Sequence, residues 1–575
     1  MPATIIREPS QGRPIFVTRG ETFYFVMDLP PSFKGDVGFA LQHALEPGIQ
    51  FPLKPKTPPT YVEQYFHLIL EVGPDVEPGL YDMKVRTNTM TYFSRHSVKV
   101  VDSFKDKFRF VHLSNMNVGD LTAPEFDEML PEEINLLAPE FIVATGDYTE
   151  WARVLDDASS WQKVLSYFRK FDAPVFMLCG SHDHEASFTR YVASKPMGLI
   201  EYGNYHGLLL LDHPGNPIDQ DYAQIQWVER ELKQNRMKRM NFIVANSDEL
   251  GLLDVWRQRG NLSNFVREHK VRMYIAGGST DWDYKEFAGK LDGLDDLHFI
   301  RTHQSSTCLR DRATGFSHYR VIEIDGDRVA YAYPNDTASE MLQYSIPSGR
   351  LRAYFDAPND GTAGRIGVTL QNALNQKFDE ARLWLRVAKN GSGAKPEIAP
   401  GKPVRILDAG DYWACEVAYD LPDKGAVRVV ASTNPEDVPP PMPISVKLEG
   451  ASQWSFSSKV TDFGLAYFEC GVSPRLRLTN QSRASVTCWP VIRVNGAQLH
   501  ADRSSISRMP LTLMGGESVS VPLVLNLRRV SPGNHKLQVH FLEDPLSRLH
   551  TFDVNLSLEG IASSRVREMA EMVEY

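Results

Sequence analysis

The chain has 575 residues, too many for one hydrophobic core, so we expect three to five domains. Its hydrophobic fraction of 42% and charged fraction of 23% are ordinary for globular proteins. A formal net charge of −10, with no basic run, argues against nucleic acid as a partner. No apolar stretch approaches the roughly 20 residues that a membrane-spanning helix needs, so we expect no transmembrane segment.

The first hundred residues have the pattern of a β-sandwich. An apolar strand is predicted from Phe23 to Met27, after a turn at residues 19–21. Further along, Tyr81, Met83 and Val85 alternate with polar residues. This alternation predicts one buried face and one face in contact with solvent. We find no cluster of catalytic residue types in this stretch.

Between residues 109 and 283, a short apolar run followed by small or polar residues recurs five times. The runs begin at Phe110, Phe141, Val175, Phe242 and Met273. Runs of this length, separated by helical patterns, predict buried strands of an α/β sheet. We expect the intervening helices over residues 124–137, 151–171, 221–236 and 261–269. The functional loops of such sheets lie beyond the C-terminal ends of the strands.

The rest of the chain predicts more β structure. An Asp325-Gly326 turn between two alternating runs is a strong hairpin signal at the end of the α/β segment. Similar strand and turn patterns near both ends of the chain suggest a repeated immunoglobulin-like unit. We divide the chain into an N-terminal β-sandwich (1–102), an α/β domain (103–335), a β domain ending in a proline-rich linker (336–440), a C-terminal immunoglobulin-like β-sandwich (441–560) and a tail or short helix (561–575).

The order and spacing of the five loops resembles the calcineurin-like metallophosphoesterase family over roughly residues 105–335. Members carry Asp-x-His, Gly-Asp, Gly-Asn-His-Asp or Glu, a lone His, and Gly-His-x-His. The corresponding residues here are Asn115-Met116-Asn117, Gly146-Asp147, Gly180-Ser181-His182-Asp183, Asn246 and Gly277-Gly278-Ser279-Thr280. The resemblance implies a multidomain α/β plus β protein, with a central metallophosphoesterase-like α/β sandwich between N-terminal and C-terminal immunoglobulin-like β-sandwich domains.

The resemblance also implies where metals would bind, and there this sequence departs from the family. Active members hold two metal ions that bind the phosphate and generate a hydroxide nucleophile. Of the seven family ligand positions, only Asp147 keeps the expected residue. Asn115 lacks the charge of the family aspartate, and Asn117 and Asn246 offer weak amide oxygens in place of imidazoles. We therefore expect no dinuclear transition-metal site and no bound cofactor.

Two further roles for the loop residues follow. Asp147 and nearby acidic residues, together with Asn115 and Asn117, could form an oxygen-rich site for Ca²⁺ or Mg²⁺. The alternative is that the acidic residues are solvated or cap helices. The other acidic residues of this group are Asp120, Asp183, Asp248, Glu249, Asp281 and Asp283.

His182 and Asp183 match the family's leaving-group acid and the residue that orients it. Without a metal-bound nucleophile we expect this pair to be vestigial.

Three functions are consistent with these residues. We favour a catalytically inactive metallophosphoesterase-like protein that serves as a structural or binding module in a cell-envelope or extracellular assembly. The first alternative is a hydrolase of phosphomonoesters or phosphodiesters with a remodelled metal site. The second is a cleft that binds a small ligand without cleaving it. Its neutral hydrogen-bonding residues would be Asn115, Asn117, Ser181 and Asn246, beside Asp147.

The predicted domains and the first residues of the chain bear on its partners and its compartment. The β-sandwich domains favour protein partners or self-assembly, with carbohydrate as an alternative ligand. The first residues lack the basic end and apolar core of a signal peptide. We therefore expect a secreted, periplasmic or cell-surface protein if a signal peptide has been removed, and a cytoplasmic one otherwise.

Overall fold

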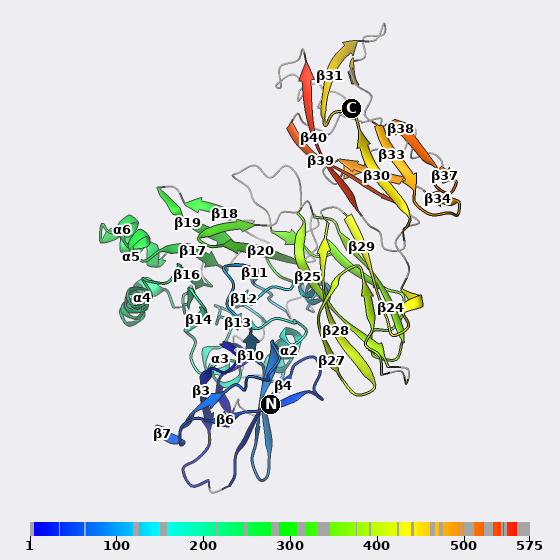
Figure 1. Cartoon of the computed structure of the whole chain (residues 1–575). Coiled ribbons are helices and arrows are strands. Elements are labelled where there is room, and N and C mark those ends of the chain that lie inside the picture. Colours follow the sequence, from blue (N-terminus) through cyan, green and yellow to red (C-terminus); the bar gives the residue numbers. More distant parts are fainter. Residues whose placement is uncertain are drawn as a thin grey trace. The chain divides into compact units, whose positions relative to one another are not determined.

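The chain is described by a computed structural model and forms two compact units, unit 1 (residues 1–351) and unit 2 (residues 352–575) (Figure 1). The finer division into five segments stays a prediction. In the part of the chain that the structure describes, no helix is long and apolar enough to cross a membrane. The described residues are 5–33, 35–62, 65–118, 126–149, 158–213, 216–246, 251–277, 287–291, 293–306, 317–331, 345–374, 376–389, 391, 393–422, 425–438, 442–460, 466–470, 475–488, 490–494, 497–498, 511–522, 533–541, 544 and 549–559.

Unit 1 begins with two five-stranded sheets that enclose an apolar core. One sheet has the order β1-β3-β8-β6, with β7 also paired to β8, and the other has the order β2-β10-β9-β4-β5. These strands are β1 (Ile6–Glu8), β2 (Ile15–Thr18), β3 (Thr22–Asp28), β4 (Gly38–His43), β5 (Gln50–Pro52), β6 (Lys54–Pro55), β7 (Thr60–Val62), β8 (Tyr65–Glu71), β9 (Gly79–Arg86) and β10 (Thr91–Val101).

The predicted alternation along β9 is correct for its apolar face and wrong for Asp82. Tyr81, Met83 and Val85 are buried, as expected. Asp82 is also buried, although its position predicted contact with solvent. Its carboxylate accepts hydrogen bonds from Arg95 Nη1 at 2.6 Å and from the backbone N–H of His96 at 2.7 Å. These bonds offset the cost of removing the charge from water.

The five predicted strands of the α/β segment are present, but they are divided between two six-stranded sheets. The first sheet has the order β13-β12-β11-β20-β21, with β22 paired to β20, and the second has the order β14-β15-β16-β17-β19-β18. Their strands are β11 (Lys107–Leu113), β12 (Ile142–Ala144), β13 (Val175–Met177), β14 (Gly198–Tyr202), β15 (Tyr205–Leu209), β16 (Met240–Ala245), β17 (Val271–Ala276), β18 (Phe287–Leu291), β19 (Leu294–Arg301), β20 (His318–Asp325), β21 (Arg328–Tyr331) and β22 (Ile346–Pro347). Buried side chains of both sheets form one shared core.

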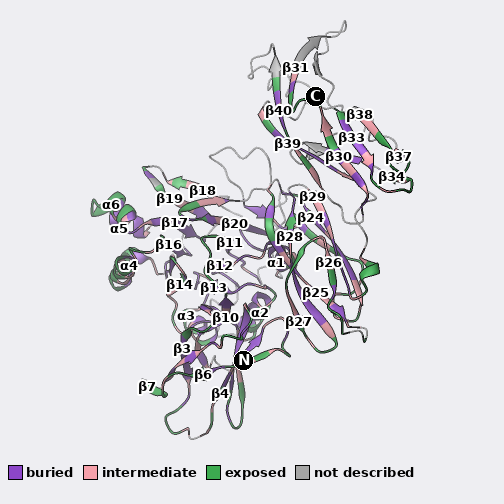
Figure 2. Cartoon of the chain, in the orientation of Figure 1, coloured by how far each residue is buried: buried purple, intermediate pink, exposed green. Residues whose placement is uncertain are grey.

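Helices correspond to all four predicted helical segments, and α3, α5 and η2 were not predicted. The bounds are α1 (Met129–Leu137), α2 (Ala158–Phe168), α3 (Glu185–Tyr191), η2 (Ile218–Gln220), α4 (Tyr222–Gln234), α5 (Gly251–Gln258) and α6 (Leu262–Glu268). The start of α4 is fixed by Asp221, whose side chain accepts the backbone N–H of Gln224 at 2.9 Å. Helices α4, α5 and α6 bury apolar side chains against the second sheet and leave exposed faces toward solvent (Figure 2). The predicted hairpin is formed by β20 and β21.

A segment before β2 joins the N-terminal sheets to the first α/β sheet. The carbonyl of Gly12 accepts the N–H of Met177 on edge strand β13 at 3.1 Å. The buried guanidinium of Arg13 donates to the carbonyls of Met177 and Pro196. Burial lowers the pKa of Arg13 to about 10. These contacts cover part of an otherwise open sheet edge within unit 1.

Unit 2 consists of β-sheets. Their strand orders are β23-β24-β29-β26, β25-β28-β27, β30-β33-β38, β32-β31-β40-β39-β35-β36 and β34-β37. The elements are β23 (Leu351–Phe355, beginning on the last residue of unit 1), β24 (Arg365–Asn372), β25 (Phe378–Ala388), β26 (Glu397–Ala399), β27 (Lys402–Asp408), β28 (Tyr412–Leu421), β29 (Gly425–Ser432), η3 (Pro435–Asp437), β30 (Ile444–Glu449), β31 (Gln453–Val460), β32 (Ala466–Cys470), β33 (Arg475–Asn480), β34 (Val486–Cys488), β35 (Pro490–Val494), β36 (Ala497–Gln498), β37 (Leu511–Leu513), β38 (Ser518–Pro522), β39 (Gly533–Phe541) and β40 (His550–Glu559). The predicted tail at 561–575 lies outside the described residues.

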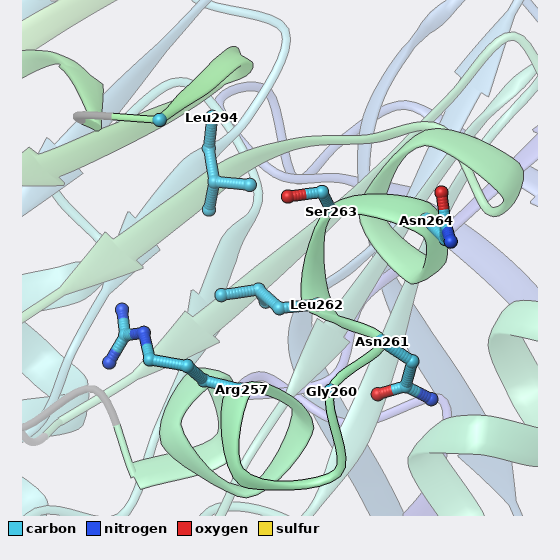
Figure 3. A pocket seen from close by; sticks show the side chains of 8 residues that line it. Arg257, Gly260, Asn261, Leu262, Ser263, Asn264 and Leu294 are labelled. Carbon is cyan, nitrogen blue, oxygen red and sulfur yellow. The ribbon is translucent and has the colours of Figure 1, made fainter.

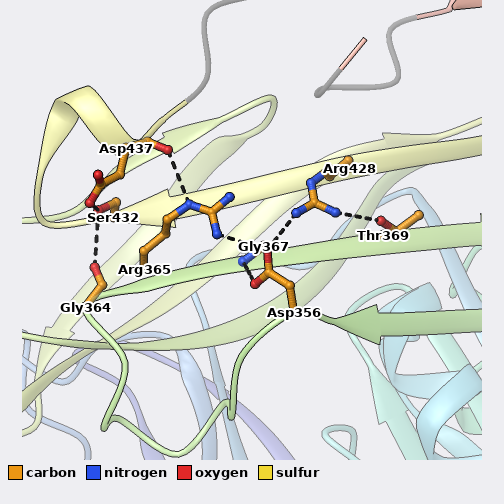
Figure 4. A network of polar contacts seen from close by, with 8 residues as sticks. All are labelled: Asp356, Gly364, Arg365, Gly367, Thr369, Arg428, Ser432 and Asp437. Atoms are coloured by element: carbon orange, nitrogen blue, oxygen red, sulfur yellow. Dashed lines mark hydrogen bonds and ion pairs between the residues drawn. The ribbon is translucent and has the colours of Figure 1, made fainter. Parts of the chain in front are cut away.

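Asp356 connects three elements of unit 2 (Figure 4). Its carboxylate accepts Gly367 N at 2.6 Å and pairs with Arg365 at 3.0 Å and Arg428 at 2.6 Å. A Cβ at position 367 would lie 2.3 Å from Asp356 Oδ2, so a larger residue there would have to displace the carboxylate. Partial burial acts to raise the pKa of Asp356, but the Gly367 bond and the two arginines outweigh it and lower that pKa.

We expect Asp356→Ala to lower the free energy of unfolding of unit 2 by about 1 kcal/mol. Most of this loss comes from the hydrogen bond to Gly367 N, because partly exposed ion pairs contribute little. Because the pKa of Asp356 is lowered in the folded protein, this stabilisation is fully present at pH values above the ordinary carboxyl pKa. It is lost as the pH falls through the pKa that Asp356 has in the folded protein. Calorimetry at pH 7 and pH 3 measures both effects. Asp411→Ala, at an exposed position of the same unit, is the matched control. Equal losses in the two variants at pH 7 would contradict this role.

Candidate functional site

The loops after β11, β12, β13 and β16 meet, as their positions in the sequence predicted. The carbonyl of Asp147 accepts the N–H groups of Met116 at 2.9 Å and Asn117 at 2.8 Å. Across the site, the side-chain oxygen of Asn246 accepts the N–H of Ser181 at 3.2 Å. Four loops from two different sheets are therefore connected by direct hydrogen bonds.

Asp147 is the centre of this network. Its Oδ1 accepts the N–H of His182 at 2.8 Å and the hydroxyl of Ser181 at 3.2 Å. Its Oδ2 accepts the side-chain amide of Asn246 at 3.2 Å. Asp147 is only 2% exposed and has a positive φ of 53°. The one retained ligand position thus makes hydrogen bonds through both oxygens, all to neutral donors.

Asp183 makes only backbone contacts in this network. Its Oδ2 accepts the N–H groups of Asp147 at 2.9 Å and Gly180 at 2.8 Å, and its Oδ1 accepts that of Tyr148 at 3.1 Å. Burial, together with the charge of Asp147, raises the pKa of Asp183 well above its usual range, against the three N–H donors that favour the charged form. Asp183 therefore holds the β12 and β13 loops together.

Asn246 uses both ends of its side chain. Its amide nitrogen donates to the carbonyl of Thr145 at 2.7 Å as well as to Asp147, and its oxygen accepts from Ser181. Since the oxygen already accepts a bond, the amide serves to join three loops rather than to present a free donor atom. Asn246 is 2% exposed.

The site is packed too closely for larger residues at two glycines. A Cβ on Gly180 would lie 2.3 Å from Asp147 Oδ1 and 2.4 Å from its backbone nitrogen. Gly146 has a positive φ of 93°, and a Cβ there would lie 2.6 Å from the Cα of Gly180. The loops after β12 and β13 can approach this closely only because both positions are glycine.

Asn115 and Asn117 lie on the first-sheet side of the site. Asn115 is buried, and its carbonyl accepts the N–H of Ser305 at 2.8 Å. Asn117 has a positive φ of 45°, a conformation that asparagine tolerates well. His182 is placed by its backbone bond to Asp147. The role of His182 as a leaving-group acid stays a prediction.

Sequence reasoning missed Ser305, which joins the β11 loop to the start of β20. Its hydroxyl accepts the N–H of Ser114 at 2.9 Å and donates to the carbonyl of His318 at 2.6 Å. Beneath it, the buried ring of His112 contacts the hydroxyls of Thr145 at 3.2 Å and Thr302 at 2.7 Å. Burial, with the charge of Arg320, lowers the pKa of His112 to about 3, so the ring is neutral at pH 7.

The donor set of these loops does not fit a dinuclear metal site. Such a site needs several anionic or imidazole ligands directed at each ion. The described loops offer Asp147, already bonded through both oxygens, Asp183, bonded to backbone N–H groups, and His182 as the one imidazole among the described residues of these family positions. Across the described residues, no three His, Cys, Asp or Glu side chains are grouped to hold a metal ion. Of the predicted hard-cation site, Asp120, Asp248, Glu249, Asp281 and Asp283 lie outside the described residues, as do residues 278–280.

A separate hollow of about 370 Å³ lies beside the loop between α5 and α6 (Figure 3). It is lined by Arg257, Gly260, Asn261, Leu262, Ser263, Asn264, Gly293 and Leu294. The guanidinium of Arg257 pairs with Asp254. None of the predicted site residues lines this hollow.

No family model matches the sequence, and no curated protein matches it either. Among solved structures, purple acid phosphatase PPD1 from yellow lupin (Lupinus luteus) seeds is similar over 61% of this chain and 69% of its own, at 9% identity and a TM-score of 0.35. GAP50, the anchor in the inner membrane complex of Plasmodium, is similar over 42% of this chain and 89% of its own, at 11% identity and a TM-score of 0.29. Likeness this weak carries no conclusion about what the present chain binds or catalyses.

Proposed function

We propose that residues 103–335 are a metallophosphoesterase-like α/β sandwich that no longer catalyses phosphoester hydrolysis. In this proposal the domain is a structural or binding module among immunoglobulin-like β-sandwich domains. Its partners are proteins or further copies of the chain, with carbohydrate as the alternative. A cell-envelope or extracellular assembly is the setting we favour, because β-sandwich modules suit it.

The observation that carries the proposal is the hydrogen bonding of Asp147. A carboxylate that binds a metal directs its oxygens at the ion, whereas here they accept an N–H, a hydroxyl and an amide. Asn246 occupies the lone-histidine position of the family pattern and donates to Asp147. Ser181 and Asn246, which stand at two of the family's ligand positions, therefore donate hydrogen bonds to Asp147 from neutral groups, and these bonds stabilise the loops without an ion.

The same network supports a role in structure. Asp147, Asp183 and Asn246 are all buried and connect loops of both sheets. A buried polar network whose groups are all satisfied stiffens the elements it joins. We therefore expect this edge of the domain to be rigid, a property that suits a binding module.

Hydrolysis assays test this proposal. We expect a chromogenic phosphomonoester and a chromogenic phosphodiester to be hydrolysed at the background rate of buffer, with or without added Mn²⁺, Mg²⁺ or Zn²⁺, because no metal-bound nucleophile forms. Asp147→Asn, which keeps the size of the side chain and removes its charge, is the matched variant. Metal-dependent turnover in the wild type that Asp147→Asn abolishes would overturn the proposal in favour of a remodelled hydrolase.

A further inference from the structure

The N-terminal ends of β16 and β17 lie at the edge of the second sheet opposite to the candidate site. These two strands are parallel neighbours, so the segments that precede them also lie side by side (Figure 1). The first segment is residues 235–239, between α4 and β16, and the second is residues 269–270, between α6 and β17. The side-chain amine of Lys270 donates to the carbonyl of Lys238 at 3.1 Å and connects the two segments.

Five cationic side chains are gathered here, and we call this group the basic edge. Its members are Lys233, Arg236, Lys238, Arg267 and Lys270. Lys233 and Arg267 belong to the last turns of α4 and α6, where a cation interacts favourably with the helix dipole. Arg236 lies beyond the end of α4, so this explanation does not extend to it. Arg239 is not counted, because it pairs with Asp106 at 2.9 Å.

Carboxylates neutralise only part of the charge of the basic edge. Glu201 pairs with Lys238 at 3.5 Å, and Glu268 is exposed at the end of α6. Lys233 and Arg236 are exposed and form no ion pair with any described residue. Five cations against two carboxylates leave an excess of three positive charges. This local excess is opposite in sign to the net charge of the chain, which is −10.

An apolar side chain lies among these cations. Met237, between Arg236 and Lys238, is 83% exposed, the largest value among the large hydrophobic side chains of the described residues. A single exposed apolar residue is common on protein surfaces and needs no explanation by itself. Cations on both sides of an exposed apolar residue, however, are the combination that binds the boundary between lipid head groups and acyl chains.

We propose that the basic edge binds the surface of an anionic lipid bilayer, with Met237 inserted between the lipid head groups. Anionic lipids attract the excess positive charge of the edge over a distance of about 10 Å at 0.1 M salt. The side chain of Met237 gains from leaving water only where an apolar layer lies beneath the anionic groups. A bilayer offers both the charges and the apolar layer, whereas a soluble polyanion offers only the charges.

Binding at the basic edge is independent of the function proposed for the Asp147 site. The loops of that site follow the C-terminal ends of their strands, whereas the basic edge precedes the N-terminal ends of β16 and β17. The proposal adds a lipid surface to the protein and carbohydrate partners considered above. Vesicle binding and phosphoester hydrolysis are separate measurements, so the failure of one proposal does not decide the other.

Co-sedimentation of the full-length protein with lipid vesicles tests the proposal. We expect vesicles of phosphatidylcholine with about 30% phosphatidylserine to bind the protein at least about tenfold more tightly than pure phosphatidylcholine vesicles, at about 0.1 M salt. Raising the salt to about 1 M should remove most of this preference, because the charges are then screened within about 3 Å. Equal binding to both kinds of vesicle, or binding to neither, would overturn the proposal.

Charge reversal locates the surface that binds. The double variant Lys233→Glu with Arg236→Glu should bind the anionic vesicles more than about tenfold more weakly than the wild type. Neither side chain takes part in an ion pair, so we expect the variant to fold. The matched control is Lys163→Glu with Lys195→Glu, which changes the net charge equally at two exposed positions outside the basic edge. An equal loss of binding in the two double variants would overturn the assignment to this edge.

Met237→Ser tests insertion separately from charge attraction. We expect about fivefold weaker binding to the anionic vesicles with the same dependence on salt, because all five cations remain. Unchanged affinity would contradict the insertion of Met237. A wild-type protein that binds soluble polyphosphate but not the vesicles would show that the edge takes a polyanion, which overturns the bilayer proposal. If the charge-reversal variant does not fold, the comparison of wild type with Met237→Ser still decides.

Discussion

Asp183→Ala is expected to lower the free energy of unfolding of unit 1 by about 3–5 kcal/mol. The change removes the acceptor for three backbone N–H groups, those of Asp147, Tyr148 and Gly180. Because these groups are buried, water does not replace the lost bonds without opening the loops. Differential scanning calorimetry measures the effect, with the transition of unit 1 assigned by hydrogen exchange, since a chain of two units does not unfold in one step.

Asp183→Asn is the matched control, because its side chain has the same shape and keeps one acceptor oxygen. We expect it to cost about 1–2 kcal/mol, since one N–H still loses its partner. If Asp183→Ala costs no more than a surface substitution, roughly 0.5 kcal/mol or less, Asp183 does not hold the loops together.

Asp147→Ala is expected to destabilise unit 1 by about 2–4 kcal/mol, whether or not metal is present. The substitution removes the acceptor for His182 N, Ser181 Oγ and Asn246 Nδ2. It also places alanine at a φ of 53°, which costs an L-residue without a local hydrogen bond about 1 kcal/mol. Unfolding followed with and without EDTA measures the effect and its independence of metal.

Two comparisons test this second prediction. Asp147→Asn tolerates the positive φ and keeps one acceptor, so it should cost less than Asp147→Ala. The double variant with Asp183→Ala should cost less than the two single changes added together, because both residues stabilise the same loops. A loss that appears only in metal-loaded protein would show that Asp147 binds an ion.

The strands were predictable because each apolar run is short, uninterrupted and followed by small or polar residues. The same pattern predicted that the loops after β11, β12, β13 and β16 meet, because they follow the C-terminal ends of neighbouring strands. Which strands belong to which of the two sheets was not predictable, because strand order depends on contacts between distant segments. The first sheet, for example, depends on the antiparallel pairing of β20 with β11.

The hydrogen bonds inside the site also could not be predicted from the sequence. A list of residue types shows that Asn246 replaces a histidine, but not that its amide donates to Asp147. Ser305 carried no signal, because a serine in a loop is common and its partners Ser114 and His318 follow no spacing rule. Asp82 was misplaced for a related reason, since alternation cannot show that Arg95 and His96 N bond to its carboxylate.

The central claim is that Asp147 belongs to a hydrogen-bonded network and not to a metal site. Its most direct test is metal content, measured by inductively coupled plasma mass spectrometry on protein purified without chelators. We expect far less than one transition-metal ion per chain, and the same value for Asp147→Asn. Close to two ions per chain in the wild type, lost in Asp147→Asn, would contradict the claim and restore Asp147 as a ligand.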